Sequence, residues 1–94
     1  MSSIATIKEC LECSTEINKR LKNGTIKRVS ISISSTDCVM KLNKHSNITV
    51  YHNFIDIHKN SADKMILWQE MVECIEMNEN KIKVKVKEGF IIFR

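Results

Sequence analysis

The chain has 94 residues, a length that fits a single domain spanning residues 1–94 and is too short for two. Apolar residues make up 43% of it and charged residues 28%, and the net charge is only +4, a composition that indicates a globular rather than a disordered chain. No unbroken apolar stretch exceeds four residues, far below the roughly 18 that a membrane span needs, so we expect no membrane partner.

Residue usage and the N-terminus point to an origin and a compartment. Ile, Lys and Asn are abundant and have AT-rich codons, which favours an AT-rich genome such as that of a virus, a mobile element, a low-GC bacterium, or some archaea and parasites. Residues 1–6 carry neither the basic nor the apolar segment of a secretion signal. If no leader has been removed, we therefore expect an intracellular protein, cytoplasmic or, if viral, in the host cytoplasm or nucleus.

Residues 3–22 are predicted to form an amphipathic helix. Ser2 or Ser3 is the expected N-cap, and Asn23–Gly24 is expected to end the helix, because glycine adopts the left-handed conformation that follows a helix C-terminus. Glutamates lie early and basic residues late in this segment, an order that complements the helix macrodipole. The predicted buried stripe contains Ile4, Ile7, Leu11, Ser14 or Thr15, Ile17 and Leu21, with Cys10 and Cys13 beside it.

Three strands are predicted next, over residues 26–34, 38–42 and 48–53, because apolar and polar residues alternate there with a period of two. Residues 54–57 slip out of phase with the third strand. They either continue it through a bulge near Asn53, which we favour, or form a separate strand after a turn at His52–Asn53.

A second helix is predicted over residues 62–78, starting after an N-cap at Asn60 or Ser61. Its expected buried stripe contains Met65, Trp68, Met71 or Val72, and Ile75. Two strands follow, one alternating perfectly between lysines and Ile82, Val84 and Val86, and one over residues 90–93, joined by a turn at Glu88–Gly89. The predicted order is α-β-β-β-α-β-β. It indicates an α+β fold with two amphipathic helices packed on one face of a mostly antiparallel 5-stranded sheet.

The cysteines and histidines are candidates for metal binding or catalysis. Cys10 and Cys13 form a C-x-x-C pair, but it lies in the middle of a helix next to glutamates, and only Cys38 and Cys74 remain as distant further ligands. Core packing is therefore the favoured role of this pair. The histidines His45, His52 and His58 stand at no telling spacing from a nucleophile, although Asp56 and His58 share a strand face. We expect no bound metal, no cofactor and no enzymatic activity.

A nucleic-acid interface is the alternative function, because lysines at positions 81, 83, 85 and 87 project from one side of a strand at intervals of about 6.6–6.8 Å. Strand-based nucleic-acid readers stack bases on aromatic residues, and this lysine row has none, so a solvated sheet face is favoured. A second basic cluster, whose distance from the first the sequence does not give, would extend such an interface. The candidate residues are Lys81, Lys83, Lys85, Lys87, Lys19, Arg20, Lys22, Lys27 and Arg28.

Two further segments favour a protein partner. The serines of the first strand leave one sheet face without bulky side chains, which lets a partner approach closely. The last strand is apolar on both sides, which requires either a central position in the sheet or a covering partner such as a second copy of the chain. The candidate partner-binding residues are Ser30, Ser32, Ser34, Phe90, Ile91, Ile92 and Phe93.

The sequence therefore predicts a small non-enzymatic interaction module that binds a protein partner, as a homodimer, in the manner of viral or mobile-element inhibitors and accessory proteins. It contains no Gly-rich phosphate loop and no hydrolase or metalloprotease motif. Binding of nucleic acid through residues 81–87 is the second hypothesis.

Overall fold

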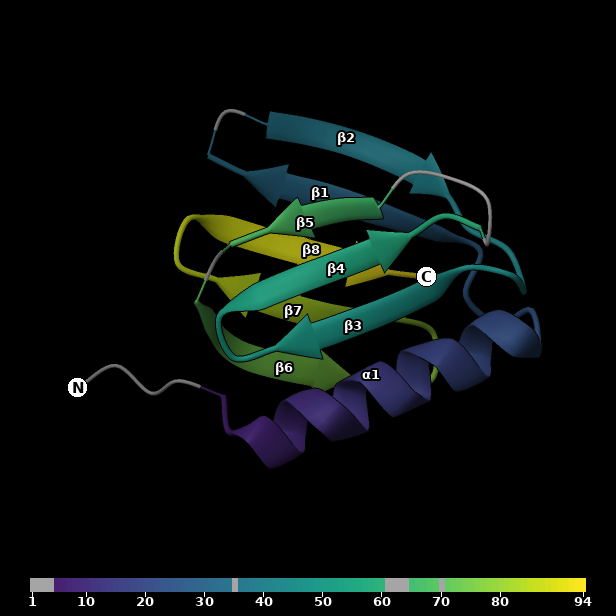
Figure 1. The fold of residues 1–94 in the computed structure, drawn as a ribbon, viewed down its shortest axis with the longest axis horizontal. Helices are drawn as coiled ribbons and strands as arrows, with labels where there is room; N and C mark the ends of the chain where they lie inside the picture. Colours follow the sequence, from purple (N-terminus) through teal and green to yellow (C-terminus); the bar gives the residue numbers. More distant parts are fainter. Residues whose placement is uncertain (1–4, 35, 61–64, 70) are drawn as a thin grey trace.

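A computed structural model describes residues 5–34, 36–60, 65–69 and 71–94, which form one helix and two antiparallel sheets (Figure 1). This is an α+β fold with an antiparallel 5-stranded sheet, as predicted, but it has one helix rather than two and a second, 3-stranded sheet. Residues 72–77 of the predicted second helix belong to the 5-stranded sheet, and residues 47–58 and 65–68 form the second sheet. The elements are α1 (Ile7–Lys22), β1 (Arg28–Ile33), β2 (Thr36–Lys41), β3 (Asn47–Tyr51), β4 (Phe54–His58), β5 (Met65–Trp68), β6 (Val72–Met77), β7 (Ile82–Val86) and β8 (Gly89–Phe93).

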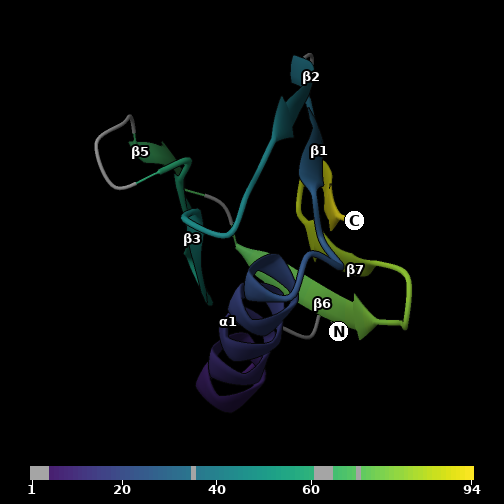
Figure 2. The ribbon, with the colours of Figure 1, turned by 90° about the vertical axis from the view of Figure 1, so that its right-hand side faces the viewer.

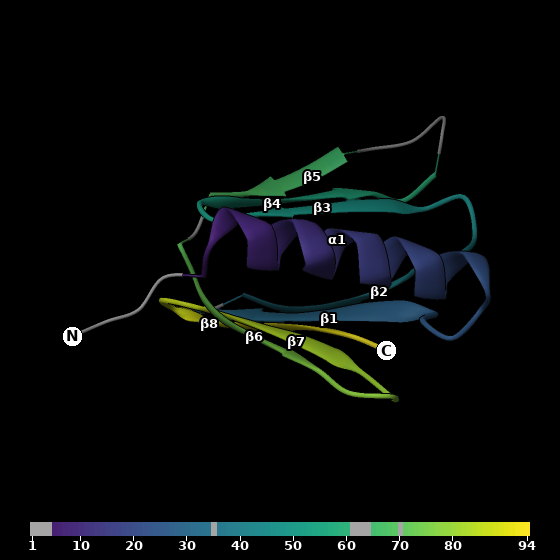
Figure 3. The same ribbon diagram turned by 90° about the horizontal axis from the view of Figure 1, so that it is seen from below.

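The two sheets face each other, and α1 closes the space between them along one side. The 5-stranded sheet has the order β2-β1-β8-β7-β6, and the 3-stranded sheet has the order β3-β4-β5. Figures 2 and 3 show the sheets as separate layers, with α1 lying between β3 of one and β6 of the other. Every strand pairing is antiparallel, in keeping with the short connections between successive strands.

The core fills this space with side chains from three sources: the inner face of each sheet and one side of α1. Apolar residues alternate along the strands, so each sheet turns one face inward. Fully buried members include Cys13 and Ile17 of α1, Ile31 of β1, Ile57 of β4 and Phe93 of β8.

The helix begins later than predicted. Thr6 is the N-cap in a capping box, in which its hydroxyl accepts from the Glu9 backbone N–H and the Glu9 carboxylate accepts from the Thr6 N–H. These hydrogen bonds lower the pKa of Glu9. The expected N-caps, Ser2 and Ser3, lie outside the described residues. The predicted end is correct, because Asn23 is the C-cap and Gly24 follows in the left-handed region.

Replacing Gly24 by alanine is expected to lower the free energy of unfolding by about 1 kcal/mol. The cost is conformational, because φ of Gly24 is +81° while a Cβ there would meet no atom within 4 Å. Thermal unfolding of the variant measures it. An unchanged stability would contradict the left-handed assignment.

The buried side of α1 differs from the predicted stripe. Cys10, Cys13, Ile17 and Leu21 face the core, whereas Ile7 and Leu11 are 51% and 56% exposed. The cause is the free edge of β3, which requires polar partners. Ser14 and Asn18, one turn apart on α1, bond the backbone of β3 and so fix the rotation of the helix.

The predicted helix over 62–78 is wrong, because β5 and β6 occupy most of this segment. In β6 the ladder to β7 shifts register between Val72 and Cys74. The extra residue of this β-bulge lets Val72 and Ile75, three positions apart, both pack against the core. In the sequence, a spacing of three between apolar residues is the same as that of the buried side of a helix. The predicted start from residue 61 to 63 lies outside the described residues.

The favoured continuous strand over 48–57 is also wrong, and the alternative is correct. β3 and β4 are separate strands of a hairpin with His52 and Asn53 at its turn. The break in the alternation of apolar and polar residues at Asn53 is therefore the place where the chain reverses direction between β3 and β4. The resulting 3-stranded sheet covers the core on the side where two helices were expected.

Candidate interaction surface

The 5-stranded sheet has one face that no described element covers. We call it the outer face; it points away from the 3-stranded sheet (Figure 2). Register and alternation give it three rows across the strands. The first row contains Lys41, Arg28, Arg94 and Lys81, the second Val39, Ser30, Ile92, Lys83 and Glu76, and the third Asp37, Ser32, Phe90, Lys85 and the exposed Cys74.

Apolar side chains occupy the centre of the outer face, from β2 to β8. Val39 is 62% exposed and Phe90 is 36% exposed, and Ile92 between them in the register is half-buried. Ser30 and Ser32 of β1 separate Val39 from the two β8 side chains. Because serine is short, β1 forms a shallow floor between apolar side chains on its two neighbours. A partner can therefore approach the backbone of β1.

The central position of β8 in the sheet accounts for only half of its apolar residues, those that face the core. β8 lies between β1 and β7, so both of its edges are paired and neither is free for a second copy. Of the candidate partner-binding residues, Ile91 and Phe93 are fully buried in the core and are not part of any surface. Ser34 lies in the turn after β1 with a φ of +51°. Phe90 and Ile92 remain candidates, together with Ser30 and Ser32.

The lysines of β7 are less available than their spacing suggests. The Lys83 ammonium lies 4.9 Å from the centre of the Phe90 ring, in a cation–π contact. Lys85 lies 3.8 Å from a carboxylate oxygen of Glu73. Lys81 and Lys87 flank the strand rather than belonging to it. Of the four predicted lysines, one therefore contacts an aromatic ring, one forms an ion pair, and two lie beyond the ends of the strand.

A different basic row forms at one end of the outer face. Arg28 and Arg94 exchange backbone hydrogen bonds, and the register places Lys41 beside Arg28 and Lys81 beside Arg94. The two basic clusters of the sequence therefore meet here through Arg28 and Lys81. Arg20 does not take part, because it bonds the Glu16 carboxylate at 2.7 Å and the Asn78 carbonyl.

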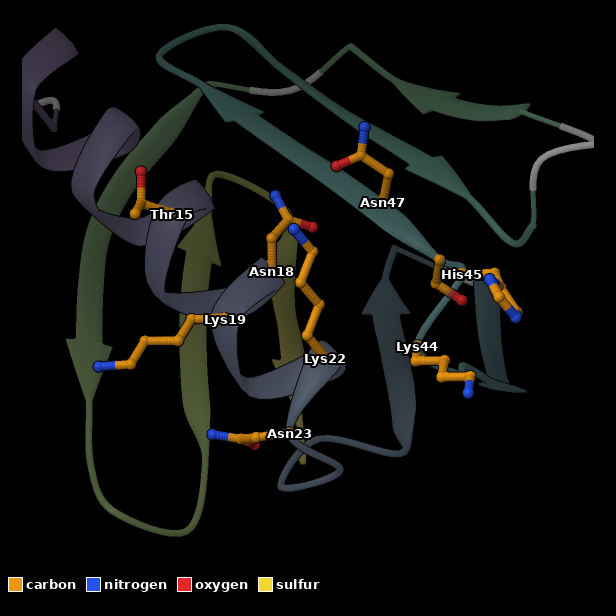
Figure 4. Close-up of a pocket in the computed structure, with 9 residues that line it drawn as sticks. Thr15, Asn18, Lys19, Lys22, Asn23, Lys44, His45 and Asn47 are labelled. Carbon is orange, nitrogen blue, oxygen red and sulfur yellow. The ribbon is translucent and has the colours of Figure 1, made fainter.

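Lys19 and Lys22 contribute to another place, an open polar hollow at the end of α1 (Figure 4). The hollow has a volume of about 1050 Å³, and Lys44 and His45 from the loop before β3 also line it. No acidic side chain lines it. Figure 4 shows the amino groups of the three lysines pointing in different directions, so they do not converge on one anion.

The cysteines of the C-x-x-C pair are core residues. Cys10 and Cys13 are both fully buried on the inner side of α1, Cys38 is half-buried and Cys74 is exposed. Among the described residues, no group of three or more His, Cys, Asp or Glu side chains is arranged to hold a metal ion.

Alkylation with iodoacetamide at neutral pH is expected to modify Cys74 first, Cys38 more slowly, and Cys10 and Cys13 only after unfolding. Burial raises the pKa of the Cys10 thiol and raises that of Cys13 to about 12, while the thiolate is the reactive form. Mass spectrometry of the peptides after timed labelling measures the order. Native-state labelling of Cys13 as fast as that of Cys74 would show that the helix does not bury it.

The histidines lie apart from the outer face. His45 lines the polar hollow, His52 stands in the β3–β4 turn, and His58 ends β4. Buried polar atoms without a hydrogen-bond partner among the described residues are His52 Nδ1 and Asp56 Oδ1. No described hydrogen bond or ion pair joins a histidine to a hydroxyl, thiol or carboxylate.

Several residues of the outer face could not be selected from the sequence. Val39, Lys41 and Arg94 belong to it only because β2 pairs with β1 and β8 lies beside β1. The alternation of Asp37, Val39 and Lys41 with Cys38 and Met40 predicts the strand β2 from the sequence. The sequence does not show which strands lie beside it.

Comparison with known proteins leaves the outer face to be interpreted from its own geometry. In the part of the chain that the structure describes, no helix has both the length and the apolarity needed to cross a membrane. No protein-family model, curated protein or solved structure matches the chain.

Proposed function

We propose that the chain is a non-enzymatic interaction module that binds a protein partner through the outer face. The observation that carries the proposal is the arrangement of this face, with an apolar centre at Val39, Ile92 and Phe90 and a charged border. Protein interfaces commonly combine an apolar centre with a polar rim. The serine floor of β1 gives an inserted side chain room to reach the backbone.

The charges of the outer face favour a protein over nucleic acid. Both signs are present, since Asp37, Glu73 and Glu76 lie among the basic residues. Only one aromatic side chain, Phe90, belongs to the described outer face, and Lys83 already contacts its ring. Sheets that bind single-stranded nucleic acid stack successive bases on several aromatic residues. The basic row indicates that the protein partner carries acidic side chains at that end.

The abundance of Ile, Lys and Asn supports an origin in a virus or mobile element, where a small protein acts by covering a surface of its partner. Its mechanism would then be occlusion. The apolar centre would cover an apolar patch of the partner, and the basic row would set the orientation.

Ile92→Asp is expected to abolish capture of the partner in a still-folded protein. A pull-down from cells of the natural source, analysed by mass spectrometry and nucleic-acid staining, measures this. Leu11→Asp is the matched control, because Leu11 is an exposed apolar residue of α1, away from the outer face. A protein retained by the wild type and the control but lost with Ile92→Asp supports the proposal. Equal retention by all three proteins refutes it.

Nucleic-acid binding is the second candidate, favoured by the row of Lys41, Arg28, Arg94 and Lys81. Fluorescence anisotropy with labelled single-stranded DNA and RNA, across a range of salt concentrations, tests it. Several phosphate contacts would give a steep fall of affinity with salt. No binding at about 50 mM salt would eliminate this candidate.

A further inference from the structure

The edge strand β2 has a free row of backbone hydrogen-bonding groups. In Figures 1 and 2 it is the outermost strand of its sheet, with no described element beyond it. The N–H of Leu42 donates to the Lys27 carbonyl, so the backbone groups of even-numbered residues in β2 point toward β1. Because N–H and C=O directions alternate along a strand, those of Asp37, Val39 and Lys41 point outward.

The same three residues place their side chains on the outer face. Val39 is the most exposed large apolar side chain among the described residues, at 62%. Asp37 and Lys41 lie two positions on either side of it with opposite charges. Neither forms an ion pair within the described part of the chain, and Asp37 accepts only a 3.3 Å hydrogen bond from Ser32.

We propose that β2 binds β2 of a second copy of the chain in an antiparallel ladder, with a two-fold axis at Val39. Each Val39 then lies opposite its counterpart, and Asp37 of each copy lies opposite Lys41 of the other. All three outward-facing residues of each strand form backbone hydrogen bonds across the axis. On the inner face, Cys38 lies opposite Met40 of the second copy, and both are partly exposed in the single chain.

The backbone and the charges select this register over its neighbours. Only residues with outward-pointing groups can face one another in hydrogen-bonded pairs, so the register can shift only in steps that keep odd-numbered residues opposite each other. A shift of one such step places Val39 opposite Asp37 or Lys41 and leaves a charged residue at each end without its counterpart. Charged residues on an edge discourage unspecific pairing, and here they match in one arrangement.

The pairing joins the outer faces of two copies into one surface with Val39 of both at its centre. A two-fold edge contact is self-complementary, as in most homodimers. A contact through one edge strand of six residues is expected to bury less area than the roughly 1,200–2,000 Å² of a stable interface, so we expect a reversible dimer whose population rises with protein concentration. The pairing uses the outward backbone groups of β2, whereas the proposed function uses side chains of the outer face; the two share Val39. The oligomeric state is measured without the partner, so the pairing can fail while the proposed function stands.

Sedimentation velocity over a range of concentrations tests the pairing. The wild type is expected to shift from the 10.9 kDa chain toward a species of twice that mass. Asp37→Lys alone and Lys41→Asp alone each place like charges opposite one another and should remain monomeric. A mixture of the two variants restores opposite charges at both positions, so the mixture should dimerise again.

Two controls separate pairing from folding. Glu79→Lys makes the same charge change as Asp37→Lys at an exposed site between β6 and β7, and should leave the dimer unchanged. Val39→Pro removes an outward N–H that β1 does not use, so the sheet should persist, as judged by circular dichroism, while the dimer is lost. A monomeric wild type at every concentration would overturn the proposal, as would single charge reversals that still dimerise.

Discussion

Phe93→Ala is expected to lower the free energy of unfolding by about 3–5 kcal/mol, the range found when a buried phenylalanine is truncated. Phe93 is fully buried at the centre of the 5-stranded sheet, where β8 places it opposite Val29 of β1 and Ile82 of β7. The loss combines the removed apolar contacts with the cavity left behind. The free energy of unfolding of a small domain is about 5–15 kcal/mol, so this loss should shift the midpoint of chemical denaturation strongly.

Phe90→Ala is the matched control, because it removes the same side chain from the same strand on the opposite face. Phe90 is 36% exposed, so its truncation should cost much less. The pair also separates stability from binding. Phe93→Ala should weaken the fold, whereas Phe90→Ala should weaken capture of a protein partner while leaving the protein folded. Equal destabilisation by both variants would contradict the assignment of Phe93 to the core and of Phe90 to the outer face.

The sequence predicted the fold class and the regular strands because alternation is a local property. β1, β2 and β7 each alternate without interruption, and the structure contains all three. The second helix was predicted wrongly because a bulge between Val72 and Cys74 adds one residue to the period of two. Buried residues three positions apart are then compatible with both a bulged strand and a helix. Only the hydrogen-bonded pairing with β7 shows that this segment is a strand.

The residues that make up the outer face could not be predicted from the sequence, because the sequence does not show which strands are neighbours. The sequence allowed the apolar run at 90–93 either a central position or a covering partner. The pairing of β8 with both β1 and β7 shows the central position, while Phe90 and Ile92 still point to the outer face. The same pairing brings Arg28 and Lys81, 53 positions apart in the chain, into one row. The position of Ser30 and Ser32 on the outer side of β1 followed from the sequence, because their alternation with buried residues is local.

The side of α1 that faces inward gives a further case, and it depends on hydrogen bonds rather than apolarity. Asn18 Nδ2 donates to the Ile48 carbonyl at 2.8 Å, and Asn18 Oδ1 accepts from the Ile48 N–H at 2.9 Å. The Ser14 hydroxyl accepts from the Val50 N–H at 2.7 Å, and its single proton lies within reach of both the Val50 carbonyl at 3.2 Å and the Cys10 carbonyl at 3.0 Å. Two side chains of the helix thus take the place of a neighbouring strand along the edge of β3.

Asn18→Ala is therefore expected to lower the free energy of unfolding by about 2–3 kcal/mol, because it removes two hydrogen bonds and leaves both backbone groups of Ile48 without their partner. Asn18→Asp has the same shape but no donor, and its carboxylate would face the Ile48 carbonyl, so it should cost at least as much at neutral pH. Thr15→Ala is the control, as Thr15 is exposed on the same helix and has no hydrogen bond to β3.

Amide hydrogen exchange gives a local measure of the same substitution. In the wild type the Ile48 and Val50 amides should exchange slowly although they lie on the edge of their sheet, because Asn18 and Ser14 hold them. In Asn18→Ala, exchange should accelerate more at Ile48 than at Val50, since the Ser14 bonds remain. Equal acceleration at both amides, matching the global loss of stability, would mean that the helix contributes only apolar burial to this edge. Selective acceleration at Ile48 would show that hydrogen bonds from α1 hold the edge of β3 in place.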